Sequence, residues 1–285
     1  MKPLKKFTSS TLLTLLTVGA AQAAQVEVSI TNLAPTGGVA LTPVWVGFHN
    51  GSFDTFNSGE VASSQLEMLA EDGNASGISS VFAANGTLAA SSKAAAGTRV
   101  QGMIGAAPIS AGNTASAIFN LSNGLDNQYF SYASMVLPSS DYFIANGDPF
   151  EHDLSTLLAD GGSITFFIGT LGDVNDAGTE INDFTTSAGN GLFPGLPPMQ
   201  GAQNTGADEN GVIRDVLDPY ANFLSIPAGY DVNNFNFNDQ NFYPHGIASV
   251  TISAVPGAVP VPAAVWLMGS GLLGLIGVAR RRQSV

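Results

Sequence analysis

The sequence predicts a mainly β protein, an antiparallel β-sandwich with one or two short helices inserted early. Several short stretches alternate apolar and polar residues with a period of two, which is typical of half-buried strands. Gly, Asn, Asp, Ser and Pro cluster between these stretches, as tight turns require. Neither an internal repeat nor a charged linker divides the middle of the chain, so residues 25–255 are expected to form one domain.

The first strand is expected in QVEVSITNL, where Val26, Val28 and Ile30 face inward and the residues between them face outward. The same alternation predicts six further strands, in TPVWVGFH, GTRVQGMIG, TASAIFNL, QYFSYASMVLP, GSITFFIGTL and GIASVTISA. GVIRDVL is a weaker strand candidate. Residues 182–242 are rich in Asn, Gly and Pro with weak periodicity, which predicts long surface loops.

Two early stretches have helical spacing instead. SGEVASSQLEMLAEDG is expected to form a helix with Ser58 as its N-cap and Gly73 just beyond its end. ASGISSVFAANG is expected to add a second short helix.

Both ends of the chain have the pattern of targeting segments. Residues 1–24 have a basic start, an apolar stretch and small residues at Ala21 and Ala23 before a cleavage site near Ala23 or Ala24, which predicts a secretory signal peptide. Near the other end, about eighteen uncharged residues, 262–279, precede three arginines. This predicts a transmembrane helix whose arginine end lies in the cytoplasm, so the body faces outward.

The last residues, 256–285, also resemble the PEP-CTERM sorting signals of Gram-negative bacteria. They contain a Pro-x-Pro motif, a Gly-rich apolar helix and a basic cluster in that order. The motif here is Pro260-Val261-Pro262, where that family has Pro-Glu-Pro. The resemblance implies recognition by an exosortase, with removal of the helix and delivery to the cell surface. A permanent tail anchor is the alternative.

The charge of the body excludes one class of partner. Outside the two ends, only Lys93, Arg99 and Arg214 oppose 22 acidic residues, so the mature body carries 3 − 22 = −19. Nucleic acid is not an expected partner, because no basic surface can neutralise its phosphates. The chain has no cysteine, which excludes disulfides, thiolate metal sites and a Cys nucleophile. Such a surface attracts divalent cations.

The segment DVNDAGTEINDF, residues 173–184, concentrates negative charge without any Lys or Arg. Its four acids are Asp173, Asp176, Glu180 and Asp183. Three interpretations are open: a cation site, acid-base chemistry, or a loop that is simply solvated. Ca²⁺ takes six to eight oxygen ligands, and Asn175, Asp176 and Glu180 around Gly178 can supply several. An EF-hand is excluded, because Phe184 stands where the closing Glu belongs.

Several motifs, taken in order, resemble the spondin amino-terminal domain family. These are SMVLPSSDYFIAN at residues 134–146 and DAGTE at 176–180, with VEVSITNLAP, PVWVGFHNGSFDTFNSGEVAS, NGVIRD and IASVTI around them. The resemblance spans most of residues 26–253 and implies an antiparallel β-sandwich. It also implies one calcium ion bound by Asp141, Asp176 and Glu180, the last of which is commonly Asp in animal members. The cysteines and thrombospondin repeats of animal spondins are absent, so their partners do not carry over.

Enzyme signatures are weak. His49, His152 and His245 lack metal-ligand spacing, and residues 151–153, EHD, are expected to be a surface turn. The segment YDVNNFNFNDQNFYPHG interleaves aromatic and amide residues, which fits either a carbohydrate-binding face or an edge strand with buried aromatics.

The expectation is therefore a secreted, surface-sorted module that is not an enzyme, binds Ca²⁺ and serves adhesion or extracellular-matrix and biofilm assembly. Expected partners are signal peptidase, an exosortase and an exopolysaccharide or surface-protein ligand. The rival is a secreted polysaccharide hydrolase that uses loop carboxylates. A third alternative is a passive structural surface protein.

Overall fold

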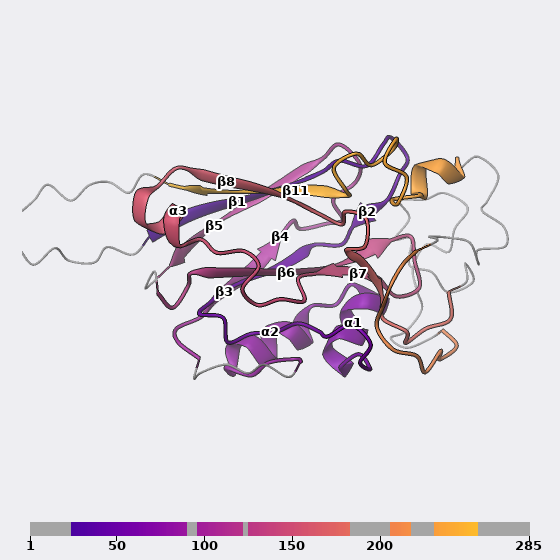
Figure 1. Cartoon of the computed structure of the whole chain (residues 1–285), viewed down its shortest axis with the longest axis horizontal. Helices are drawn as coiled ribbons and strands as arrows, with labels where there is room; N and C mark the ends of the chain where they lie inside the picture. Colours follow the sequence, from indigo (N-terminus) through magenta and orange to yellow (C-terminus); the bar gives the residue numbers. More distant parts are fainter. Residues whose placement is uncertain (1–23, 90–95, 122–124, 183–205, 218–230, 256–285) are drawn as a thin grey trace, which may run out of the picture.

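A computed structural model describes residues 24–89, 96–121, 125–182, 206–217 and 231–255 (Figure 1). The predicted signal peptide, apart from Ala24, and the predicted sorting signal of residues 256–285 with its predicted transmembrane helix lie outside these ranges. Within the described residues, no helix has the length and apolar character needed to cross a membrane.

Two antiparallel sheets form the body of the protein. The smaller sheet has the strand order β5 (Thr114–Leu121), β1 (Ala24–Asn32), β11 (Ala248–Ala254) and β8 (Ser163–Ile168). The larger sheet has the order β10 (Arg214–Asp215), β9 (Val174–Asp176), β7 (Tyr142–Ala145), β6 (Tyr129–Leu137), β3 (Val44–His49) and β4 (Val100–Ile104), with β2 (Ala40–Leu41) paired to β6. The predicted mainly antiparallel architecture is confirmed.

The main core lies between the two sheets. Val26, Val28 and Ile30 of β1 point into it as predicted, and each is fully buried. From the larger sheet, Val46 and Phe48 contribute to the same cluster. Because side chains of a strand alternate between faces, the residues between these valines lie on the outer face of the smaller sheet.

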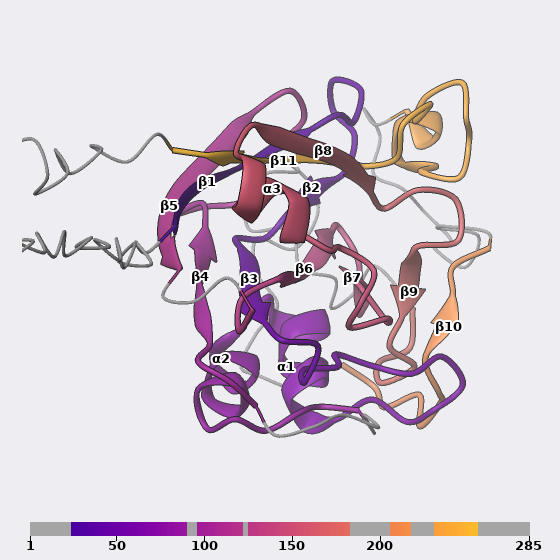
Figure 2. The same ribbon diagram turned by 60° about the vertical axis from the view of Figure 1, so that its left-hand side comes forward.

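Helices form a third layer on the far face of the larger sheet (Figures 1 and 2). Here α1 (Ser64–Asp72) and α2 (Ser76–Ala83) cover a second apolar cluster. At its centre the Trp45 ring lies 5.3 Å from Phe53 and 5.1 Å from Phe82, measured between centroids. Since both faces of β3 are covered, all six of its residues are buried, which is why its sequence is apolar with little alternation.

The first helix begins later than predicted. Its N-cap is Ser63, whose Oγ accepts a hydrogen bond from Leu66 N, and Ser58 lies in the preceding turn. Ser58 is too far from the apolar run that packs on the sheet for its hydroxyl to serve the first turn. The predicted end is confirmed, since Gly73 adopts a left-handed φ of 66° and donates its N–H to Leu69 O.

The weaker strand candidate GVIRDVL contains β10, but the sequence did not predict five other short elements, which are β2, β7, β9, α3 (Ser155–Asp160) and the 3₁₀ helix η1 (Val232–Phe235). Most of them are too short to display a period. The segment around η1 is also neither a carbohydrate-binding face nor an edge strand. It runs as the 3₁₀ turn and loops, and it buries Phe235, Phe237 and Tyr243 in the main core.

Candidate metal centre

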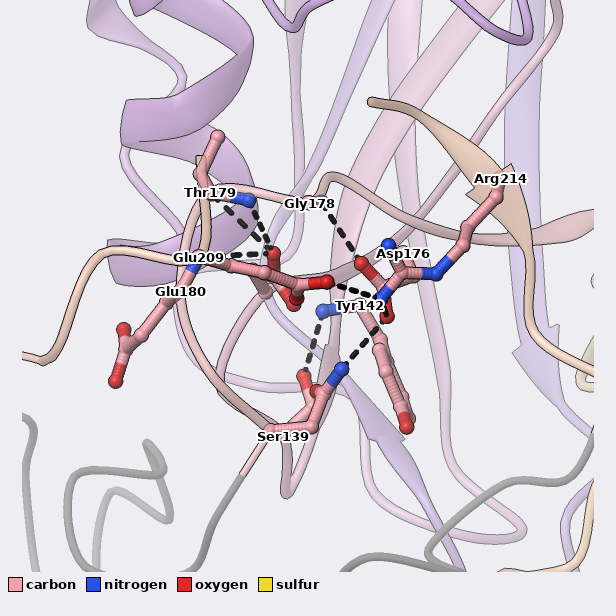
Figure 3. Close-up of polar contacts among 10 residues, drawn as sticks. Ser139, Tyr142, Asp176, Gly178, Thr179, Glu180, Glu209 and Arg214 are labelled. Atoms are coloured by element: carbon pink, nitrogen blue, oxygen red, sulfur yellow. Dashed lines mark hydrogen bonds and ion pairs between the residues drawn. The ribbon is translucent and has the colours of Figure 1, made fainter. Parts of the chain in front are cut away.

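Asp141 stands at the end of a tight turn between β6 and β7. Ser139 fixes this turn, because its Oγ donates to Val136 O at 2.6 Å and accepts from Tyr142 N at 3.0 Å (Figure 3). The turn leads directly into a strand that is buried on both faces. Asp141 directly precedes this buried strand and is itself fully buried.

Asp176 ends the neighbouring strand β9 and begins a turn of its own. Its Oδ1 accepts from Gly178 N at 2.8 Å, the short-range bond by which an Asp organises a turn. Gly178 has a φ of +67°, and a Cβ there would meet the backbone of Val212 at 2.7 Å. Only glycine fits this position, since the turn needs both the left-handed backbone and the close approach.

The turn after Asp176 wraps around the Asp141 carboxylate. Oδ2 of Asp141 accepts from Thr179 N at 2.9 Å and from Glu180 N at 3.2 Å. Its other oxygen, Oδ1, is buried and makes no hydrogen bond within the described part of the chain. The structure thus joins the two motifs that the sequence places more than thirty residues apart, and it leaves one buried carboxylate oxygen without a partner.

The two aspartates lie close enough for their charges to interact. Burial and, second to it, the Asp176 charge raise the pKa of Asp141 to about 7, against the backbone N–H groups that favour ionisation. Burial also raises the pKa of Asp176, although Gly178 N–H and Arg214 oppose that change. A pair of buried carboxylates is costly without a compensating cation.

Arg214 and Glu209 belong to this centre, and sequence reasoning did not single them out. Arg214 donates to Asp176 Oδ2 at 2.9 Å and lies 2.7 Å from Glu209 Oε1 (Figure 3). Strand β10 positions it, because Arg214 pairs directly with Asp176 across the ladder. The sequence did contain a hint of this role, because the body of the chain has only three basic residues, and Arg214 is the one nearest to the acidic segment.

Glu180 contributes its backbone rather than its carboxylate. Its N–H reaches Asp141, while its side chain points away from Asp176 (Figure 3). The side chain is nonetheless buried, at 2% exposure, and lies near Gly206, where an added Cβ would be 2.0 Å from its carboxyl carbon. Among the described residues, no three Asp, Glu or His side chains lie close enough together to hold a metal ion. The structure thus brings together two of the three predicted ligands.

The other residues of the acidic segment that the structure describes do not belong to this centre. Asp173 accepts from Thr170 N at 3.1 Å in a surface turn, and Asp183 lies outside the described residues. Asn175 was expected to offer an oxygen beside Asp176, but adjacent residues of a strand face opposite ways. Its amide donates to Asp173 O instead. The charge of this segment therefore divides between a turn and the buried centre.

The three histidines do not meet. The His49 ring lies in a buried network with Ser131, His152 stacks on Phe166 at 3.9 Å, and His245 stacks on Phe167 at 4.9 Å, both measured between ring centroids. Within the EHD turn, Glu151 is half exposed while His152 is largely buried, so only part of that turn is surface.

The chain was compared with curated proteins and with models of known protein families. No curated protein matches the chain at a significant level. The family model Spondin_N matches residues 35–147, which include the turn that carries Asp141 but stop before the segment that carries Asp176. This match supports the resemblance of residues 35–147 to the spondin amino-terminal domain.

Proposed function

We propose that this protein is an extracellular spondin-like module that binds one calcium ion between Asp141 and Asp176 and serves adhesion or matrix assembly. The observation that supports the ion most directly is the unpartnered Oδ1 of Asp141, a buried oxygen beside a second buried carboxylate. In native proteins such an atom is rare and calls for an explanation. A hard cation that prefers oxygen ligands supplies one.

The charge balance of the centre supports a divalent ion. Asp141, Asp176 and Glu209 together carry −3 when ionised, and Arg214 returns +1, which leaves −2. One Ca²⁺ would neutralise this remainder. With only two buried carboxylates, the rest of the coordination would come from backbone carbonyls and water. This suits the weak range of extracellular modules, where Kd values are about 10⁻⁴ to 10⁻³ M.

The proposed role of the ion is to hold two segments together. Asp141 precedes β7, and Asp176 opens the turn that contacts it. A bound ion would stabilise the end of the larger sheet, including the short β9–β10 ladder, which has only two residue pairs. Adhesion surfaces on this end would then form only outside the cell, where calcium is abundant.

Calorimetric titration of the full-length protein with CaCl₂, run beside thermal unfolding in calcium and in EDTA, tests this proposal. We expect one site, and a stabilisation of about 2.7 kcal/mol at a calcium concentration one hundred times Kd. The variant Asp176→Asn should lose both signals. A matched control is Asp173→Asn, which removes a charge from the same segment outside the buried centre. The absence of heat and of stabilisation at about 10 mM calcium, ten times the weak limit of such modules, would overturn the calcium proposal.

Export and sorting are part of the same proposal. We infer that the signal peptide of residues 1–24 directs secretion, and that an exosortase processes residues 256–285 so that the body reaches the cell surface or matrix of a Gram-negative bacterium. Mass spectrometry of the mature protein would test both ends at once. A mature chain that retains the three terminal arginines would support a permanent anchor instead.

A further inference from the structure

A second polar site lies at the far end of β7 from Asp141, near Ala145 and Gly147. It is a pocket of about 280 Å³ at the ends of β6, β7 and β9. The residues that matter for its chemistry are Phe56, Tyr132, Glu151, Asp173, Asn175 and Asp215. All of them lie in described parts of the chain.

This pocket does not share side chains with the candidate metal centre. Asn175 and Asp176 are neighbours on β9, and Arg214 and Asp215 are neighbours on β10. In each pair, strand alternation sends one side chain to the metal centre and the other to the pocket. The two sites therefore share β9 and β10 but no side chain.

Tyr132 provides the strongest indication that the pocket is built for a ligand. The residue is 3% exposed and lines the pocket, yet its hydroxyl makes no hydrogen bond to any described residue. A buried phenol normally finds a partner for its O–H. Burial raises its pKa well above 10, and the charges of Glu151 and Asp173 raise it too. The hydroxyl thus stays protonated and remains available as a donor.

The acids of the pocket lack a cation. Burial raises the pKa of Glu151, and Asp173 and Asp148 raise it further. The nearest basic ring is His152, whose Nε2 is 3.8 Å from Glu151. Burial lowers the pKa of His152 to about 4, so this ring is neutral at pH 7 and provides no counter-charge. Asp173 Oδ2 already accepts from Thr170 N, so its Oδ1 and the carboxylates of Glu151 and Asp215 are the oxygens that can accept hydrogen bonds from a ligand.

The lining selects one class of ligand. No Lys or Arg lines the pocket, so an anion would meet only repulsion. A ligand must instead offer hydroxyl or ammonium donors to the carboxylates, and acceptors to the Tyr132 hydroxyl and the amide of Asn175. Sugar hydroxyls do both, and the Phe56 ring offers an apolar wall.

We propose that this pocket binds one pyranose ring of a neutral or amino sugar, held by Tyr132, Glu151, Asp173 and Asp215 against Phe56. The volume is slightly below the roughly 300–1,000 Å³ of pockets for drug-sized ligands, which suits a single ring. The inference gives the adhesive role proposed above a ligand class, and its chemistry does not depend on the calcium ion.

Ligand-observed saturation-transfer NMR on the full-length protein tests this inference. The probes are glucose, galactose, mannose, glucosamine, N-acetylglucosamine, glucuronic acid and, as a stand-in for a basic protein side chain, lysine. Each is used at about 20 mM, well above a Kd of roughly 1 mM. We expect transfer to at least one neutral or amino sugar and none to glucuronic acid. Tyr132→Phe and Asp215→Asn should each weaken binding by about 5-fold, the effect of one lost hydrogen bond.

Controls separate the pocket from the fold and from the metal centre. Tyr132→Phe removes a hydroxyl that has no partner, so the thermal midpoint should not fall. Asp160→Asn, at the exposed end of α3, should leave transfer unchanged. Transfer should also persist in EDTA and in Asp176→Asn, so that failure of the calcium proposal does not affect this test. Four outcomes would each overturn the inference. They are no transfer to any sugar, transfer that the two pocket variants leave unchanged, transfer that is lost in EDTA, and transfer only to lysine as a probe for a basic protein side chain.

Discussion

Two buried polar clusters in the larger sheet differ in how completely they are satisfied. In the first, His49 Nδ1 accepts from Gly51 N at 2.9 Å, so Nε2 carries the proton and donates to Ser131 Oγ at 2.8 Å. Asn146 donates to the same oxygen at 3.1 Å and accepts from Tyr132 N at 3.0 Å. Burial lowers the pKa of His49 to about 3, so the cluster is neutral. In the second, around Asp141 and Asp176, charge remains uncompensated.

The difference indicates which buried polar groups stabilise the fold and which are candidates for binding a ligand. The Ser131–His49 contact is not a nucleophilic pair, because a histidine that donates to a serine is not free to take its proton. Every side chain of that cluster serves the fold. The aspartate cluster instead keeps a buried oxygen with no partner, so its polarity is not explained by the fold alone.

The largest expected effect comes from breaking the satisfied cluster. Asn146→Ala leaves Tyr132 N–H unpaired in the core and removes the amide that bonds Ser131 and Asp148, so we expect unfolding to become easier by about 3 kcal/mol. Chemical denaturation measures this, and calcium should not change the loss. Asn120→Ala, on the exposed face of β5, is the matched control and should stay within about 0.5 kcal/mol of wild type. If the loss of stability in Asn146→Ala did depend on calcium, the two clusters would be energetically coupled and could not be treated as separate.

The second effect is a pH dependence carried by Asp141. Its folded pKa, about 7, lies above its ordinary 3.8 because of burial and Asp176. Between these values the folded state holds a proton that the unfolded state has lost, so stability from this group is full below pH 4 and is lost as the pH rises through 7. His49 and His152 act oppositely, because burial lowers their pKa values below 6.5, so they destabilise the fold as the pH falls.

The variant Asp141→Asn isolates the aspartate from the histidines. In EDTA, the stability of the variant minus that of wild type should rise by on the order of 2 kcal/mol from pH 5 to pH 8, since the histidine contributions cancel in the difference. Saturating calcium should abolish that rise, because the ion stabilises the ionised carboxylate of wild type. Thermal unfolding across the pH range measures both. A flat difference in EDTA would mean that Asp141 only shapes its turn.

The sequence predicts the fold better than the site, for physical reasons. Val26, Val28 and Ile30 repeat with a period that only a half-buried strand produces, so β1 could be assigned from local pattern alone. Strand β7 could not, because its four residues are buried on both faces and show no alternation. In the candidate metal centre, the family resemblance pointed to Asp141 and Asp176. Arg214 arrives only through the pairing of β9 with β10, a contact across 38 residues that no local pattern encodes.

A third, smaller effect concerns Arg214, the only cation that the described structure places in the aspartate cluster. Its side chain is 44% exposed, so its ion pairs are partly screened and are worth about 1 kcal/mol. Arg214→Gln should therefore destabilise the calcium-free protein by about that amount, while calcium binding tightens because a competing cation is gone. Calorimetry and thermal unfolding measure the two changes. Weaker calcium binding in Arg214→Gln would instead mean that the arginine shapes the site rather than competes for it.

The smallest effect is expected at Glu180, and it decides how many carboxylates the centre uses. Its backbone N–H already holds Asp141, whereas its carboxylate points away from Asp176 (Figure 3). Glu180→Gln keeps the backbone bond and the side-chain volume, so calcium affinity should fall by only about 2-fold to 3-fold, less than the tenfold change that 1.4 kcal/mol produces. Asp208→Asn, at an exposed position across an isolated bridge from Glu180, is the matched control. A loss of about tenfold or more in Glu180→Gln alone would require the carboxylate to turn inward when the ion binds, and would make Glu180 the third ligand that the family resemblance predicts.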